Sequence, residues 1–232
     1  GVYIVGVANM TFTVGGNAYW LIQKRSRATG GLIWSVTYNP STGSDIPYDV
    51  AVDSTGIYIV GYSTISGTNT QWRMQKRNLA TGAVIWSVPS NPSAGDDVAV
   101  SVAVDGTGLY VVGYDSIPGA SNTQWRMQKR NLATGAVIWS VPSNPSAGSD
   151  IAYGVAVDST GVYAVGYSSI NWTDTQWRMQ KRSLTTGGLI WSRTSNPSSG
   201  WDWAFGVAVD STGVYIAGQY SGIGWRIEKR QR

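Results

Sequence analysis

The 232-residue sequence contains no cysteine and no histidine, and its single glutamate is Glu228. These absences exclude disulfides, zinc sites made from Cys and His, and catalytic pairs of Ser or Cys with His. Charged residues make up only 13% of the chain and the net charge is +4, so the composition does not indicate disorder. No apolar run approaches the roughly 20 residues of a membrane-spanning helix, and we expect no membrane insertion.

Glycine, tryptophan and tyrosine are abundant instead. The chain has 29 Gly, 12 Trp and 13 Tyr against two Phe, and 42% of its residues are hydrophobic. Trp and Tyr combine an apolar ring with a polar group. This mixture predicts an all-β protein of short strands and tight turns, with aromatic side chains packed between sheets. The lack of Cys does not decide between an oxidising and a reducing compartment, because a secreted protein with a large core needs no disulfides.

The sequence repeats itself at intervals of 52 to 55 residues. The hexapeptide GVYIVG at 1–6 returns as GIYIVG at 56–61, GLYVVG at 108–113, GVYAVG at 161–166 and GVYIAG at 213–218. A longer segment of 27 residues, Asn69 to Gly95, recurs unchanged from Asn122 to Gly148. A catalytic site needs different groups at one point, whereas duplication of a segment builds a scaffold. A fixed period of this length indicates a repeat architecture.

Each complete unit contains four apolar or alternating runs. In one unit these runs are 150–158, 162–168, 176–182 and 189–195. Short turns, DSTG and SLTTG, join the first run to the second and the third to the fourth, and the other two connections are longer. Asp, Ser and Gly stabilise such tight turns. Four strands with alternating tight turns and long loops are typical of one blade of a β-propeller.

The repeats predict one propeller domain over 1–232, with units at approximately 1–44, 45–96, 97–149, 150–201 and 202–232. The first unit lacks its first strand and the last unit lacks its fourth, which gives eighteen strands. A ring of five blades with two incomplete ones is the preferred interpretation, and four blades with redundant ends is the alternative. The incomplete blades suggest that another molecule, or residues outside this sequence, fills the missing edges, because an unpaired strand is a template for β-addition.

Two family resemblances support this fold. The segment GVAVDSTGVYAVGYS, 154–168, resembles the signature of the prokaryotic beta-propeller repeat family. The segment LATGAVIWSV, 79–88, is similar to the Thr-Gly-x-x-x-Trp motif of pyrroloquinoline-quinone-type propeller repeats, in which the Trp docks between neighbouring blades. The second resemblance implies a blade-docking role for the tryptophans at the matching positions, Trp34, Trp86, Trp139 and Trp191.

The resemblance to the quinone enzymes ends at blade packing. Those enzymes have eight blades, a calcium site and a large cofactor pocket, whereas this chain has about four and a half units and one glutamate. We therefore expect neither quinone chemistry nor any other cofactor.

Aspartates recur at two positions of the unit. One set stands at the start of the innermost strand and consists of Asp45, Asp97, Asp150 and Asp202. These carboxylates could ring the channel mouth and bind a ligand or a hard cation such as calcium. The favoured alternative is that each one accepts hydrogen bonds from backbone N–H groups of the loop between blades. The second set, Asp53, Asp105, Asp158 and Asp210, opens the DSTG-type turns and is explained by turn stabilisation.

The third strand of the units alternates Trp with Arg and closes in most cases on Gln-Lys-Arg. Basic residues interleaved with aromatic ones can indicate a nucleic-acid site. With a net charge of only +4, however, we expect a dispersed, solvated belt on the outer part of the blades and no nucleic-acid partner.

The loops that differ between units are the places for a specific site. Asn9 and Asn171 each begin an N-x-T sequon, so both are candidate glycan acceptors in an extracellular setting. Trp172 lies in the second of these loops, and Trp201 and Trp203 flank Asp202. The three indoles could stack on a sugar ring. The pair at 201 and 203 could instead seal the incomplete last blade, and this alternative is slightly favoured.

These observations favour a non-enzymatic, extracellular or cell-surface propeller that acts in surface structure, adhesion or assembly. A multivalent, lectin-like carbohydrate-binding propeller is the alternative, and a glycoside hydrolase is a remote one, because hydrolases of this fold commonly use a Glu acid in the central funnel. Glycans, or further copies of the chain bound through open strand edges, are the expected partners.

Overall fold

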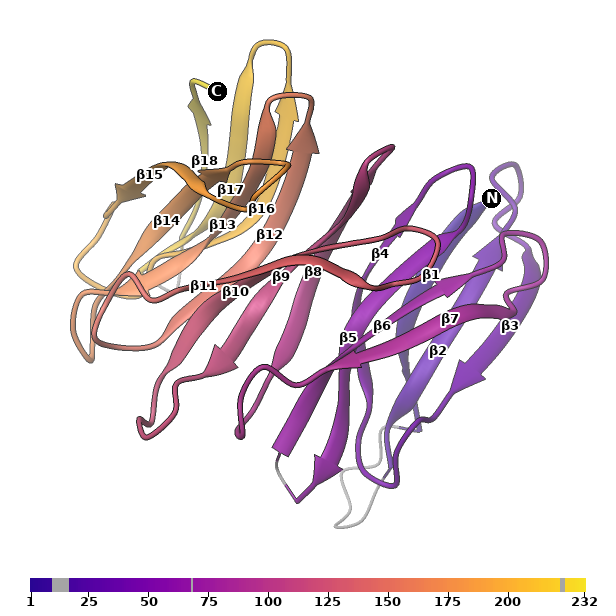
Figure 1. Ribbon diagram of the computed structural model, residues 1–232. Coiled ribbons are helices and arrows are strands. Elements are labelled where there is room, and N and C mark those ends of the chain that lie inside the picture. The colour runs from indigo at the N-terminus through magenta and orange to yellow at the C-terminus, as the bar shows by residue number, and fades with distance from the viewer. Residues whose placement is uncertain (10–16, 68, 222–223) are drawn as a thin grey trace.

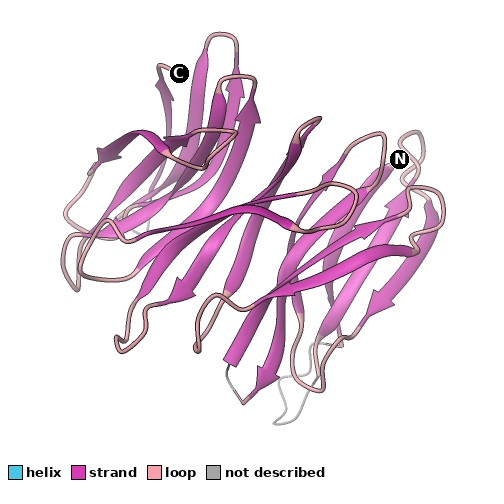
Figure 2. Cartoon of the chain, in the orientation of Figure 1, coloured by secondary structure: helices cyan, strands magenta, loops and turns pink. Residues whose placement is uncertain are grey.

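The structure is a computed structural model that describes residues 1–9, 17–67, 69–221 and 224–232. Its regular secondary structure consists of strands, and Figure 2 shows no helix in the drawn part of the chain. The described residues accordingly offer no apolar helix long enough to cross a membrane. The all-β prediction is confirmed.

The eighteen strands follow one another with short connections. Their bounds are β1 (Val2–Ala8), β2 (Tyr19–Arg25), β3 (Leu32–Tyr38), β4 (Ile46–Val52), β5 (Ile57–Ser66), β6 (Asn69–Arg77), β7 (Val84–Ser90), β8 (Val98–Asp105), β9 (Gly108–Ser116), β10 (Thr123–Arg130), β11 (Val137–Ser143), β12 (Asp150–Asp158), β13 (Gly161–Ser169), β14 (Thr175–Arg182), β15 (Leu189–Ser195), β16 (Trp203–Asp210), β17 (Gly213–Tyr220) and β18 (Gly224–Arg230).

The strands form five antiparallel sheets in chain order, each pairing only consecutive strands. The sheets are β1–β3, β4–β7, β8–β11, β12–β15 and β16–β18. Each sheet is a propeller blade, and the two three-stranded sheets are the incomplete first and last units that the repeats predict. Neighbouring blades contact each other through their innermost strands, β1 against β4, β4 against β8, β8 against β12 and β12 against β16.

The five blades stand in an open row. In Figure 1 the first and last sheets lie at opposite ends of the molecule, and no strand pairing in the described ranges joins them. The ring expected from the repeat count is therefore not closed by these five sheets. Because the four interfaces are built from equivalent residues, each blade is placed on its neighbour in a similar way, and the ends stay apart.

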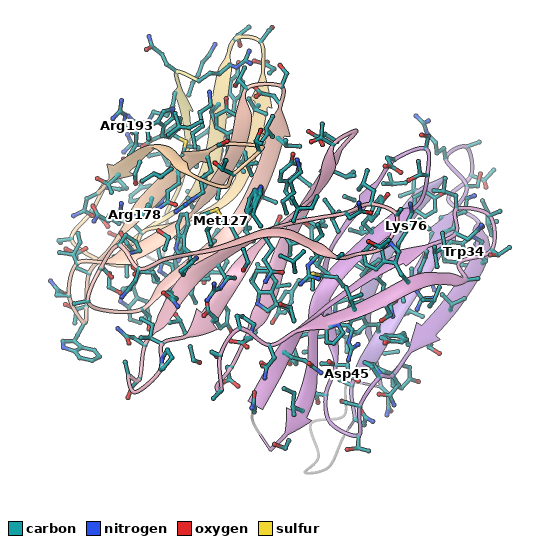
Figure 3. The ribbon with its side chains drawn as sticks, viewed as in Figure 1. Trp34, Asp45, Lys76, Met127, Arg178 and Arg193 are labelled. Carbon is teal, nitrogen blue, oxygen red and sulfur yellow. The ribbon has the colours of Figure 1, made fainter. Side chains whose placement is uncertain are left out.

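Each interface has an apolar centre with the same construction. Between the second and third blades, Trp72 and Met74 of β6 pack with Tyr58 of β5 against Leu109 and Val111 of β9. Met127 of β10, labelled in Figure 3, is the equivalent of Met74 in the third blade and packs in the next interface. The β6-type tryptophan also donates a hydrogen bond from Nε1 to a backbone carbonyl of the following blade. The three bonds are Trp72 to Tyr114 O at 3.0 Å, Trp125 to Tyr167 O at 3.0 Å and Trp177 to Gln219 O at 2.8 Å.

A second contact joins the outer parts of neighbouring blades. The Trp86 indole donates from Nε1 to Leu132 O of the next blade at 3.1 Å, and Lys76 Nζ donates to the same carbonyl at 3.1 Å. The indole also lies against the Thr-Gly turn of that blade, where a Cβ built on Gly135 would be 3.0 Å from Cε3 of Trp86. Trp139 repeats these contacts with Leu184 and Gly187, and Trp34 packs on Gly82. Trp191, in the fourth blade, packs on Tyr163 of its own blade.

The basic residues of the third strands do not form a solvated belt, so that expectation is wrong. The buried ones are Lys76, Arg77, Lys129, Arg130, Lys181 and Arg182. Lys76 and Lys129 reach the next blade, whereas Lys181 and each of the three arginines bond within their own blade. Arg77, for example, donates to Gln75 Oε1 at 2.8 Å and to Gly82 O at 2.7 Å. Burial lowers the pKa of Arg130 to about 10, which leaves its guanidinium charged at neutral pH.

The connectors between blades are held by a repeated Asn-Pro-Ser-x-Gly-x-Asp motif. In the connector that leads to β8, Asp97 accepts from Ser93 Oγ at 2.5 Å and from Ser93 N at 3.1 Å. With its amide nitrogen turned toward the carboxylate, Asn91 donates to Asp97 Oδ2 at 2.9 Å. The same bonds recur at Asp45, Asp150 and Asp202. The motif therefore gives every connector one conformation and satisfies its buried polar groups.

The docking contact predicts unequal costs for two matched glycine substitutions. Gly187 and Gly30 have similar positive φ values, 70° and 68°, but a Cβ on Gly187 would lie 2.8 Å from Trp139 Cε3, whereas Gly30 has open space. Both changes to Ala incur about 1–2 kcal/mol of left-handed backbone strain. We expect Gly187→Ala to destabilise further by about 1–3 kcal/mol, the usual cost of overpacking. Urea unfolding monitored by circular dichroism measures the difference, and equal costs would contradict the docking contact.

The connector carboxylates predict a pH effect. Burial raises the pKa of Asp150 above its ordinary value of 3.8, so between these two values the folded chain binds more protons than the unfolded chain. This contribution to the free energy of unfolding therefore rises as the pH falls. Asp150→Asn keeps the shape and removes this titration, while weakening the bonds from Ser146. We expect it to cost about 1–3 kcal/mol, and the cost to be larger at pH 4, close to the ordinary pKa, than at pH 7. Thermal unfolding of both proteins at the two pH values checks this, and a cost that shrinks at pH 4 would contradict it.

Candidate functional site

The four inner-strand aspartates lie at the long-loop end of the blades, where Figure 3 labels Asp45. Asp45, Asp97, Asp150 and Asp202 are fully buried, and each is bonded within its own connector. The arrangement matches the alternative of loop hydrogen bonding. No three acidic side chains of the described residues are gathered in a way that could hold a metal ion. The structure therefore does not bring these carboxylates together as a ring.

The carboxylates of the second set of aspartates accept hydrogen bonds from the backbone of their own tight turns. Asp53 Oδ1 accepts from Thr55 N at 2.7 Å and from Gly56 N at 3.0 Å. The Thr55 hydroxyl then bonds the Tyr58 hydroxyl at 2.8 Å, which ties the turn to the strand. Asp105, Asp158 and Asp210 accept the same bonds. These residues have a structural role at the end of the molecule opposite the long loops.

The sequon residues are placed on exposed loops. Asn171 is exposed, and its Oδ1 accepts from Thr173 N at 2.9 Å. Asn9 is exposed and donates to Asn17 O at 3.2 Å, while the other two residues of its sequon lie outside the described residues. Trp172 is 98% exposed at the tip of the same loop as Asn171. Both asparagines are accessible to a modifying enzyme, and their glycosylation stays a prediction.

The tryptophans of the last blade belong to an aromatic cluster. The rings of Trp201 and Trp203 are stacked at 6.0 Å and 8°, and Trp203 also stacks on Tyr167 of the fourth blade at 5.6 Å. Phe205 continues the cluster toward Tyr153, at 5.1 Å. Trp203 is thus covered by aromatic neighbours that join β12 and β13 to β16. Of this stacked pair, Trp201 is the more open to a ligand, since it is 54% exposed.

Four inner-strand residues, three of them aromatic, were not predicted from the sequence. The innermost strands of the second to fifth blades, β4, β8, β12 and β16, each contain a β-bulge whose extra residue has no partner on the neighbouring strand. These extra residues are Tyr48, Val100, Tyr153 and Phe205. Bulges re-aim side chains and are frequent beside binding sites. The available signal was the aromatic residue that three of these four units have at this position.

A cavity of about 400 Å³ opens between the second and third blades at the long-loop end. Tyr48 and Tyr62 line one wall, with ring centroids 6.1 Å apart, and Tyr114 and Asp96 line the other. Burial, and secondarily the nearby Tyr48 and Asp96, raise the pKa of Tyr62 to about 12, and burial likewise raises that of Tyr114. The phenols are therefore neutral at physiological pH and can both donate and accept hydrogen bonds. This cavity brings aromatic rings and a carboxylate together and is a candidate binding site.

The single glutamate lies away from this cavity. Glu228 is on β18 of the last blade, where it accepts from Ser195 Oγ at 2.8 Å and pairs with Arg226 at 3.0 Å and with Arg230. Asp115 likewise forms an ion pair, with its Oδ2 at 2.7 Å from a guanidinium nitrogen of Arg126.

Comparison with known proteins gives matches at the level of fold. No protein-family model matches the chain. No curated protein matches it either. Among solved structures, BamB from Moraxella catarrhalis is similar over 95% of this chain and 59% of its own, with 16% identity and a TM-score of 0.50. The quinohemoprotein alcohol dehydrogenase of Comamonas testosteroni is similar over 89% and 38%, with 13% identity and a TM-score of 0.56.

A third structure, the periplasmic gluconolactonase PpgL of Pseudomonas aeruginosa, aligns over 99% of this chain and 83% of its own, with 11% identity and a TM-score of 0.47. The chain spans less than two thirds of the length of the first two structures. At these identities the likeness concerns the fold alone, and it agrees with the sheet topology. The chain has a β-propeller fold of five blades, similar to the folds of BamB and the quinohemoprotein alcohol dehydrogenase.

Proposed function

We propose that this protein is a non-enzymatic assembly module of a cell surface or extracellular structure, which joins copies of itself by packing the last blade of one copy on the first blade of another. The observation that supports the proposal most strongly is the exposure of two interface residues on β18. Trp225 is 77% exposed and Ile227 is 62% exposed. Apolar side chains exposed together in this way mark an interaction surface.

The exposure of these two residues can be compared with that of the residues at the same repeat positions in the other blades. Trp225 occupies the position of Trp72, Trp125 and Trp177, which are at most 2% exposed. Ile227 occupies the position of Met74, Met127 and Met179, which are buried as well. The interior tryptophans donate to a carbonyl of the following blade, whereas Trp225 Nε1 has no acceptor among the described residues. The outer face of the last blade therefore carries the same kinds of side chain as the interior interfaces, but no other described blade covers it.

The first blade offers the complementary face. Val2 and Ile4 of β1 are 47% and 44% exposed, while their equivalents in the second blade, Ile57 and Ile59, are completely buried against the first. In the interior interfaces, the Trp and Met of one blade pack on this apolar pair of the next. A second copy of the chain can present the same pair to Trp225 and Ile227. Such a head-to-tail contact joins two different surfaces and generates chains of molecules.

The arrangement of the acidic residues supports the absence of enzymatic activity. Glu228 is held between two arginines on an outer strand, and eight aspartates serve the connectors and turns described above. A glycoside hydrolase needs two carboxyl groups about 5–10 Å apart on either side of a bound sugar. The exposed sequon residues Asn9 and Asn171 suit an extracellular setting. The absence of Cys is compatible with it, because the interfaces stabilise the fold without disulfides.

The assembly proposal predicts that a charge on the exposed face of the last blade prevents self-association. We expect sedimentation velocity to show concentration-dependent association of the unmodified chain, and Trp225→Lys to remain monomeric over the same concentrations. Trp172→Lys is the matched control, because Trp172 is equally accessible but lies on a loop away from both end faces. We expect this control to associate like the unmodified chain.

Two results would contradict the proposal. One is a monomeric unmodified chain at the highest concentration tested. The other is equal loss of association in both variants, which would indicate non-specific contacts of exposed indoles. Circular dichroism of the variants checks that each is folded, and turnover of a polysaccharide by the unmodified chain would contradict the non-enzymatic part.

A further inference from the structure

The cavity between the second and third blades combines repeated and unrepeated residues. Tyr62 and Tyr114 stand at one repeat position. The bulge residue Tyr48 has a counterpart in Tyr153 of the fourth blade, whereas the third blade has Val100 there. Asp96 stands where the other connectors have Ser44, Ser149 and Trp201. The acidic residue of the lining is therefore the one that no other connector repeats.

The walls of the cavity are fixed by hydrogen bonds between the two blades. Trp72 Nε1 of β6 donates to Tyr114 O at 3.0 Å, which sets the position of that tyrosine relative to the second blade. Thr70 Oγ1 donates to Asp97 O at 3.1 Å, and Asp97 N donates to Thr70 O at 3.2 Å. Ser116 Oγ holds the Asp96 carbonyl at 3.1 Å. A ligand would meet a preformed site and would pay little conformational entropy.

Four polar groups of the cavity lining have no hydrogen-bond partner among the described residues, namely the hydroxyls of Tyr48, Tyr62 and Tyr114 and the carboxylate of Asp96. The hydroxyls of Thr64 and Thr70, which also line the cavity, donate to Ser44 O and Asp97 O. Tyr48 is 49% exposed, and Asp96 is exposed, so both can reach a ligand from solvent. The site thus combines flat apolar ring faces with three neutral hydroxyls and one strong acceptor.

We propose that this cavity binds a neutral saccharide, with a pyranose ring against Tyr48 and Tyr62 and its hydroxyls bonded to Asp96 and the phenols. Aromatic faces bury the C–H surface of such a ring, and the phenols donate to or accept from its hydroxyls. The Asp96 carboxylate accepts two hydroxyl donors and repels anions. The site goes beyond the assembly proposal, because it lies between interior blades and does not use the exposed end faces.

A quaternary ammonium group is the competing ligand, since aromatic cages with a carboxylate also bind such cations. The cavity favours the saccharide on two grounds. Its volume of about 400 Å³ exceeds what a trimethylammonium group fills. Its lining also includes Thr64 and Thr70, whose hydroxyl oxygens can accept from a polyol and have nothing to offer a tetraalkyl cation beyond their dipoles.

The test is binding of neutral oligosaccharides to the 232-residue chain. A glycan array selects among gluco-, galacto- and manno-oligosaccharides, and isothermal titration calorimetry measures the affinity of those retained. We expect Tyr48→Ala to weaken binding by about tenfold or more, since one lost stacking contact and its hydrogen bond exceed about 1.4 kcal/mol. Asp96→Asn should weaken binding as well. Affinity should be the same at pH 6 and pH 9, because the pKa of Tyr62 is about 12.

Tyr153→Ala is the matched control. Tyr153 occupies the same bulge position but packs in the aromatic cluster with Tyr167 and Phe205 and does not line the cavity. We expect it to keep full affinity, and Trp225→Lys to keep it too, which separates this site from assembly. The proposal is overturned if no neutral glycan binds, if Tyr153→Ala loses affinity as Tyr48→Ala does, or if choline chloride binds in its place.

Discussion

The fold depends on one contact, which the second and third blades each make with the blade that follows. An indole and a lysine of one blade both donate to a single leucine carbonyl of the next, as Trp86 and Lys76 do at Leu132. The indole lies flat on a glycine turn, and the ammonium also contacts a tyrosine ring, at 5.2 Å for Lys76 and Tyr58. This contact buries a cation with its hydrogen bonds satisfied, which removes most of the penalty of burial.

The same contact explains the unusual composition. Glycine is required at the turn, because a side chain there would occupy the space of the indole. Lysine and arginine are required inside the interfaces, and few other charges are needed on the surface of the sheets. Twelve tryptophans are enough to supply both the inner and the outer contacts of the blades. Blade packing, repeated along the row, thus stabilises the fold in a chain that has no cysteine.

Much of this architecture could be predicted from the sequence, because strands, tight turns and blade units each leave a periodic signal. The location of the lysines could not. Alternation along a strand shows that Lys76 shares a face with Trp72 and Met74, but not that a neighbouring carbonyl lies within its reach. The candidate cavity was also hidden, because a bulge shifts the strand by one residue and places Tyr48 on a side that simple alternation does not predict. The open row was missed since repeat counting fixes the number of blades and not their relative rotation.

The duplicated segment has a consequence for how such a protein can change. β6 with β7 and β10 with β11 have identical sequences and the same pairing register, so either hairpin fits the surface that receives the other. What distinguishes the two blades is limited to a few unrepeated bonds, such as those of Ser101 and Val102 to Asp49. Unequal exchange between the two copies in the gene would therefore lengthen or shorten the row by one blade and create no junction that the protein has not already accommodated.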